Sequence, residues 1–251
     1  MIIRIDHVSL SCADFSRATQ DLARFGYRKQ FEEDAVKNVQ IKKPLLHRWS
    51  ENHDLALFSS DSGISIELLN HHGIQDAAPS FFTPIIRGAD EEMTKSKNAV
   101  NIGKQRGVLT TMGSFDCIVL EGKKRPFVLQ ELALHAENLD ESESFWSCFG
   151  FQRVLAEDDC RMLKFASPFQ ASPCVLYLLQ SAGPMRKTKL DDAGFASIAF
   201  ISNNVGEERD FLDKRHVHPS AVEQLNVHGK TFSICFAQGS QGEIVELLSL
   251  Q

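Results

Sequence analysis

Residues 1–27 read MIIRIDHVSLSCADFSRATQDLARFGY, and they contain a strand pattern, a helix pattern and a glycine stop in that order. The alternation of apolar and other residues around His7 predicts a half-buried strand. Asp14 suits the N-cap of the helix that follows, and Gly26 suits its end, where a left-handed conformation costs glycine least. His7 is therefore either a packed structural residue or one ligand of a metal site.

The same pattern recurs about half a chain length further on, which indicates a duplication. Phe25-Gly26-Tyr27 corresponds to Phe149-Gly150-Phe151, and an ungapped shift places Asn138 as a second N-cap. A further copy is expected from residue 194, with a helix near 207–212 and closing strands at 231–236 and 243–248. A weaker copy is expected at 81–121, with strands at 83–87, 108–112 and 115–120 and a polar helical stretch from residue 90. Each copy is predicted to be a βαβββ module.

Composition excludes several classes of protein. The chain has 251 residues, 43% of them hydrophobic, and a net charge of −6, so it is expected to bury a substantial core and to bind no nucleic acid. It has no apolar run of membrane-spanning length and no export-signal pattern at its start, so no membrane partner and a cytoplasmic location are expected. The six scattered cysteines are expected to be free thiols.

Four segments together resemble the vicinal oxygen chelate superfamily, which includes glyoxalase I, extradiol dioxygenases, fosfomycin-resistance enzymes and bleomycin-resistance proteins. They are IDHVSL at 5–10, FGY at 25–27, GISIELL at 63–69 and GEIVELL at 242–248. The resemblance implies an α+β fold of duplicated, paired βαβββ modules that form cup-shaped mixed sheets. It implies a glyoxalase-like domain over 1–125, whose second module is degenerate, and another over 126–251, with modules paired inside each half.

The resemblance also implies ligand positions on the first and last strands of a module, and these are filled by His7 and Glu67. An imidazole and a carboxylate suit a divalent metal such as iron, manganese, zinc or nickel. The first strand of the degenerate module has no histidine, so Glu121 is nominated as the third ligand. Glu67 is also a candidate catalytic base. Glu246, with no histidine opposite it, is interpreted as a polar residue facing the other cup.

Three functions stay open at this stage. The first is a metal-dependent lyase, isomerase or dioxygenase acting on a small molecule with two adjacent oxygens. The second is a metal-free, bleomycin-resistance-like protein that sequesters an apolar or aromatic ligand in a cup lined by Phe58, Phe115, Phe165 or Phe236. The third is a scaffold with an interaction role only. A homodimer is possible in each case, and the histidines at 71–72 and 216–218 are expected to lie in surface loops.

Overall fold

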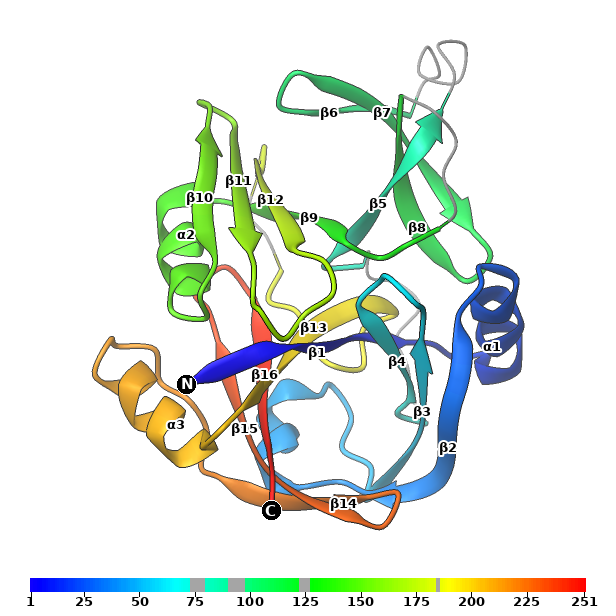
Figure 1. Ribbon diagram of the computed structural model, residues 1–251, viewed down its shortest axis with the longest axis vertical. Coiled ribbons are helices and arrows are strands. Elements are labelled where there is room, and N and C mark those ends of the chain that lie inside the picture. Colours follow the sequence, from blue (N-terminus) through cyan, green and yellow to red (C-terminus); the bar gives the residue numbers. More distant parts are fainter. Residues whose placement is uncertain (73–79, 90–97, 122–126, 184–185) are drawn as a thin grey trace.

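The computed structural model describes residues 1–72, 80–89, 98–121, 127–183 and 186–251 (Figure 1). Four modules follow one another along the chain. The first consists of β1 (Ile2–Ser11), α1 (Phe15–Arg24), β2 (Arg28–Lys37), the 3₁₀ helix η1 (Gln40–Leu45), β3 (Asn52–Ser59) and β4 (Ser65–Asn70). The second consists of β5 (Thr83–Ala89), β6 (Ala99–Ile102), β7 (Gln105–Met112) and β8 (Phe115–Glu121).

The third and fourth modules repeat the order of the first. The third consists of β9 (Glu131–Ala136), α2 (Leu139–Ser147), β10 (Gln152–Ala156), β11 (Cys160–Phe165) and β12 (Cys174–Gln180). The fourth consists of β13 (Gly194–Ser202), α3 (Val205–Asp213), β14 (Glu223–Val227), β15 (Lys230–Gln238) and β16 (Ile244–Leu250). The predicted α+β class with duplicated modules is therefore confirmed, while the helical stretch expected from residue 90 lies outside the described residues.

The local signals of the duplication are also confirmed. The Asp14 side chain accepts a hydrogen bond from the first turn of α1, and the Asn138 side chain does the same for α2. Gly26 and Gly150 follow these helices with φ angles of 85° and 90°, a region that favours glycine. The two strand–helix–glycine units therefore end in the same backbone conformation.

The modules pair differently from the expectation, because each of the two sheets combines modules from both halves of the chain. The first sheet has the order β14-β15-β16-β13-β1-β4-β3-β2, and the second has the order β10-β11-β12-β9-β5-β8-β7-β6. Strand length gives the physical reason: β1 pairs with β13 from Ile2 to Ser11, whereas β5 pairs with β9 only at Thr83 and Pro84. Proline lacks an N–H donor, so β5 offers β1 a poorer ladder than β13 does. The boundary proposed at residue 125 lies outside the described residues, and the division into domains stays a prediction.

The first sheet curls until its two edge strands meet. The ring of Phe31 on β2 stacks on His228, next to β14, with 4.8 Å between ring centroids. Figure 1 shows the chain around η1 inside the ring of strands that this curling produces. Ile41 and Leu45 of η1 are buried there in a second hydrophobic core, separate from the larger one. We call the space enclosed by the first sheet the first cup, and this cup is filled by its own chain.

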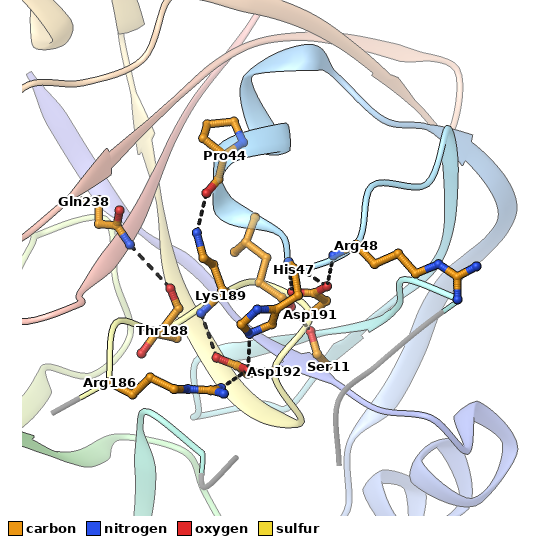
Figure 2. A network of polar contacts seen from close by, with 11 residues as sticks. Ser11, Pro44, His47, Arg48, Arg186, Thr188, Lys189, Asp191, Asp192 and Gln238 are labelled. Atoms are coloured by element: carbon orange, nitrogen blue, oxygen red, sulfur yellow. Dashed lines mark hydrogen bonds and ion pairs between the residues drawn. The ribbon is translucent and has the colours of Figure 1, made fainter. Parts of the chain in front are cut away.

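A short segment before β13, residues 186–192, fastens η1 and the chain after it, and we call this segment the strap (Figure 2). Asp191, only 1% exposed, accepts hydrogen bonds from the backbone N–H groups of His47 and Arg48 at 2.8–2.9 Å. Asp192 contacts the His47 ring at 2.9 Å and pairs with Arg186. The strap therefore holds the filling of the first cup in place.

The six cysteines are all free, as expected, and five of them are buried. Burial raises the pKa of the buried thiols, to about 12 for Cys12, Cys117, Cys174 and Cys235 and to about 11 for Cys160. Among the helices that the structure describes, none has the length and hydrophobicity needed to cross a membrane.

Candidate metal centre

Three side chains from three strands of the first sheet converge inside the first cup. They are His7 on β1, Glu67 on β4 and Glu246 on β16, and one ligand atom from each lies within 4.8 Å of the other two. The Nε2 atom of His7 is 3.2 Å from Oε2 of Glu67 and 3.9 Å from Oε2 of Glu246. Metal–ligand bonds near 2 Å place two ligands about 3 Å apart at right angles and about 4 Å apart on opposite sides. The spacing therefore fits one divalent metal ion.

The orientation of His7 depends on an irregularity in β1. Ile5 pairs with Phe200 and His7 with the adjacent Ala199, so Asp6 is an extra residue in the ladder. Such a bulge re-aims side chains, and here Oδ2 of Asp6 lies 3.1 Å from Nδ1 of His7. A carboxylate on one ring nitrogen fixes the tautomer and directs the other nitrogen to the metal in many metal sites. Nε2 of His7 is buried and faces the two glutamates.

The charges of the three groups depend on one another. Burial by itself lowers the pKa of His7, but the carboxylates of Glu67 and Asp6 outweigh burial and raise that pKa well above its usual value. Burial by itself raises the pKa of Glu67, yet the His7 charge and hydrogen bonds from His7 and Ser9 lower it overall. For Glu246 burial dominates and raises the pKa. A metal ion would take the place of a proton that the three side chains otherwise share.

Ser197 on β13 occupies the fourth ligand position of the cup. Glu67 pairs with Ser9, which lies two residues after His7 on β1. In the same way, Glu246 pairs with Ala199, which lies two residues after Ser197 on β13. The Ser197 hydroxyl is buried and has no hydrogen-bond partner within the described parts of the chain. A hydroxyl is a weak ligand, so three protein ligands are present and the metal would keep open positions. The residues present therefore fit a divalent metal.

The structure brings His7 and Glu67 together as the sequence predicted, but it does not bring Glu121 to them. Glu121 is exposed at the end of β8, a strand of the second sheet. Glu246 is the third candidate ligand and the second carboxylate, although it was expected to be a polar residue of another cup. Both differences follow from the pairing of the first module with the fourth.

Two other expectations need correction. Three of the four phenylalanines expected to line a cup, at 58, 115 and 165, belong to the larger core, and only Phe236 lies in the first cup. His71 was expected in a surface loop, but it is 2% exposed and stacks on His53, which is 0% exposed. None of the four ring nitrogens of this histidine pair has a hydrogen-bond partner among the described residues.

In the second sheet, Glu131 and Tyr177 hold the positions that His7 and Glu67 hold in the first. Arg87 donates from Nε and Nη2 to the two carboxylate oxygens of Glu131 at 3.0 and 2.9 Å. The Tyr177 hydroxyl lies 3.4 Å from the same carboxylate. A guanidinium group therefore neutralises the acid at this position.

Lys42, which no sequence motif marked, lies in η1 and is 4% exposed. Its ammonium lies 5.7 Å from the centre of the Phe236 ring, and its charge lowers the pKa of both Glu67 and Glu246. No strand or helix pattern marks a functional lysine in this stretch, because the position of η1 depends on the curling of the sheet and on the strap.

Comparison with known proteins identifies relatives in structure only. No protein-family model matches the chain, and no curated protein matches it in sequence. Glyoxalase I from Zea mays superposes with a TM-score of 0.62 over 98% of this chain and 92% of that chain, at 16% identity. A mutant of the same enzyme gives a TM-score of 0.65 with the same coverage and identity. A candidate dioxygenase from Bacillus subtilis subsp. subtilis strain 168 gives 0.62 over 99% of this chain and 85% of that chain, at 13% identity.

These likenesses span nearly the whole chain, and at such identities they show a shared fold. The chain therefore has the vicinal oxygen chelate fold that the four sequence segments predicted.

Proposed function

We propose that the chain is a divalent-metal-dependent enzyme that acts on a small molecule with two adjacent oxygen atoms. The observation that carries this proposal is the convergence of His7, Glu67 and Glu246 within 4.8 Å of one another, on strands that the sequence places far apart. Iron, manganese, zinc and nickel all accept one imidazole and two carboxylates. A lyase, an isomerase and a dioxygenase are the reaction classes that the proposal includes.

Each residue has a separate task in this proposal. His7, Glu67 and Glu246 would hold the metal, and the bound metal would supply Lewis-acid chemistry to a chelated substrate. Asp6 holds Nδ1 of His7, so Nε2 stays directed at the metal position. Ser9 donates a hydrogen bond of 3.3 Å to Glu67 and fixes that carboxylate. Glu67 is also the candidate base, because 17% of its side chain is exposed, compared with 5% for His7 and 6% for Glu246.

Metal content measured after purification without chelator tests the proposal. Wild-type protein is expected to retain or take up one divalent ion per chain, and the variants His7→Ala, Glu67→Gln and Glu246→Gln are expected to lose it. Glu121→Gln is the matched control, because its carboxylate is exposed on the second sheet. Wild-type protein that takes up none of the four metals would refute the proposal and favour a metal-free binding role.

The assembly and location of the protein remain predictions. A small-molecule partner, a homodimer and a cytoplasmic location are proposed together with the enzyme function. Sedimentation of the purified chain would decide between a monomer and a dimer.

A further inference from the structure

Lys42 is a cation of η1, the short helix inside the first cup, and it is 4% exposed. Its ammonium lies over the ring of Phe236, and Phe236 pairs directly with Glu246 across β15 and β16. Paired residues of neighbouring strands project from the same face of a sheet, so Lys42 approaches the same wall that carries Glu246. Among the described residues, the ammonium of Lys42 forms no ion pair and no hydrogen bond.

The groups around Lys42 provide few negative charges. Its charge acts on two carboxylates, those of Glu67 and Glu246, and on two imidazoles, those of His53 and His71. The two histidines carry no negative charge in any protonation state that a protein normally reaches. The carboxylates of the metal centre are therefore the anions that offset the buried ammonium.

Metal binding would remove that compensation. Two glutamates neutralise one divalent cation, and His7 binds a metal as a neutral imidazole. Asp6, the remaining acid beside the centre, already pairs with Arg4 at 2.7 Å. The metal-loaded cup would then hold one uncompensated positive charge on Lys42, and a buried charge without a partner is costly.

We propose that the metal-loaded first cup selects a monoanion with two adjacent oxygens, and that Lys42 is the specificity-determining residue that pairs with the negative charge of this ligand. This inference rests on the proposed function, because it requires the metal at His7, Glu67 and Glu246. Lys42 belongs to η1, and the side chains of His7 and Glu246 are only 5% and 6% exposed. A ligand that reaches the metal centre therefore requires the chain around η1 to move.

The test uses protein loaded with Mn²⁺ and three small probes in calorimetric titrations. Glycolate is a monoanion with two adjacent oxygens, hydroxyacetone is neutral with two adjacent oxygens, and acetate is a monoanion without the second oxygen donor. Wild-type protein is expected to bind glycolate at least about tenfold more tightly than either other probe, because a desolvated charge pair is lost with hydroxyacetone and a chelate with acetate.

Variants at two neighbouring lysines separate specificity from general charge. Lys42→Met is expected to weaken glycolate binding at least about tenfold and to leave hydroxyacetone binding unchanged, while Lys42→Arg retains most of the glycolate affinity. Lys43→Met is the matched control, because Lys43 is exposed on the same short helix. It is expected to behave as wild type with all three probes.

The outcomes distinguish this inference from the proposed function. Wild-type protein that takes up none of iron, manganese, zinc and nickel overturns both. Normal Mn²⁺ binding with equal affinities for glycolate and hydroxyacetone overturns the role of Lys42 alone, and this comparison needs no variant to fold. Glycolate affinity that is unchanged in Lys42→Met, with Mn²⁺ still bound, overturns it as well.

Discussion

Replacement of Asp191 by alanine should destabilise the protein and loosen the chain that fills the first cup. The carboxylate is 1% exposed and accepts hydrogen bonds from two backbone N–H groups, those of His47 and Arg48. A hydrogen bond to a charged group contributes about 1.5–3 kcal/mol, so two give an upper range of about 3–6 kcal/mol. Both donor residues are exposed and water can reach them in the variant, so we expect a loss of about 3 kcal/mol.

Urea unfolding followed by circular dichroism measures this loss, and hydrogen exchange locates it. Exchange should accelerate first in peptides covering residues 40–48, because the strap holds that part of the chain. Asp61→Ala is the control: its side chain is 81% exposed, and an exposed ion pair contributes at most about 1 kcal/mol. A loss in Asp191→Ala no larger than that of the control would refute the role of the strap, and so would unchanged exchange over 40–48.

Three further predictions concern single residues. Cys148 is only partly buried and should react rapidly with a thiol reagent at neutral pH, whereas the five buried thiols, whose pKa values are raised, should react only on unfolding. Rapid reaction of two or more thiols would contradict this. Burial and the Lys42 charge lower the pKa of His71 from 6.5 to about 3, so the unfolded chain binds a proton below pH 6.5 that the folded chain does not. The free energy of unfolding should therefore fall as the pH is lowered, by about 2 kcal/mol from His71 alone between pH 6.5 and about pH 5. Urea titrations of His71→Leu should lack that part of the fall. Glu121→Gln should leave both stability and metal content unchanged, and a loss of metal in this variant would show that Glu121 contributes to metal binding.

The sequence predicted the parts of the fold that local physics controls. A strand, a capped helix and a glycine with positive φ are encoded within about 25 residues, so Asp14, Gly26, Asn138 and Gly150 could be assigned without long-range information. His7 could be placed near the last strand of its own module because the two strands are neighbours in one compact unit. Parallel pairing of β1 with β4 confirms that placement.

The pairing between modules could not be predicted in the same way. Each module leaves one strand free to pair, and each such strand contains apolar residues, so the alternatives differ mainly in ladder length and in single features such as Pro84. An error in the pairing of the modules therefore moved the third candidate ligand from Glu246 to Glu121. The role of Lys42 could not be predicted for a related reason: its burial depends on strap contacts that join residues far apart in sequence.

The chosen pairing also determines when the three candidate ligands can come together. Asp6 and His7 belong to β1, whereas Glu246 belongs to β16. Between these two strands lies β13, which pairs with β1 on one edge and with β16 on the other. A chain in which only the first module is folded has one imidazole and one carboxylate, which is too few for a closed protein site. Metal affinity should therefore depend on formation of the whole first sheet, and bound metal should in turn stabilise the β1–β13 pair that joins the two halves of the chain.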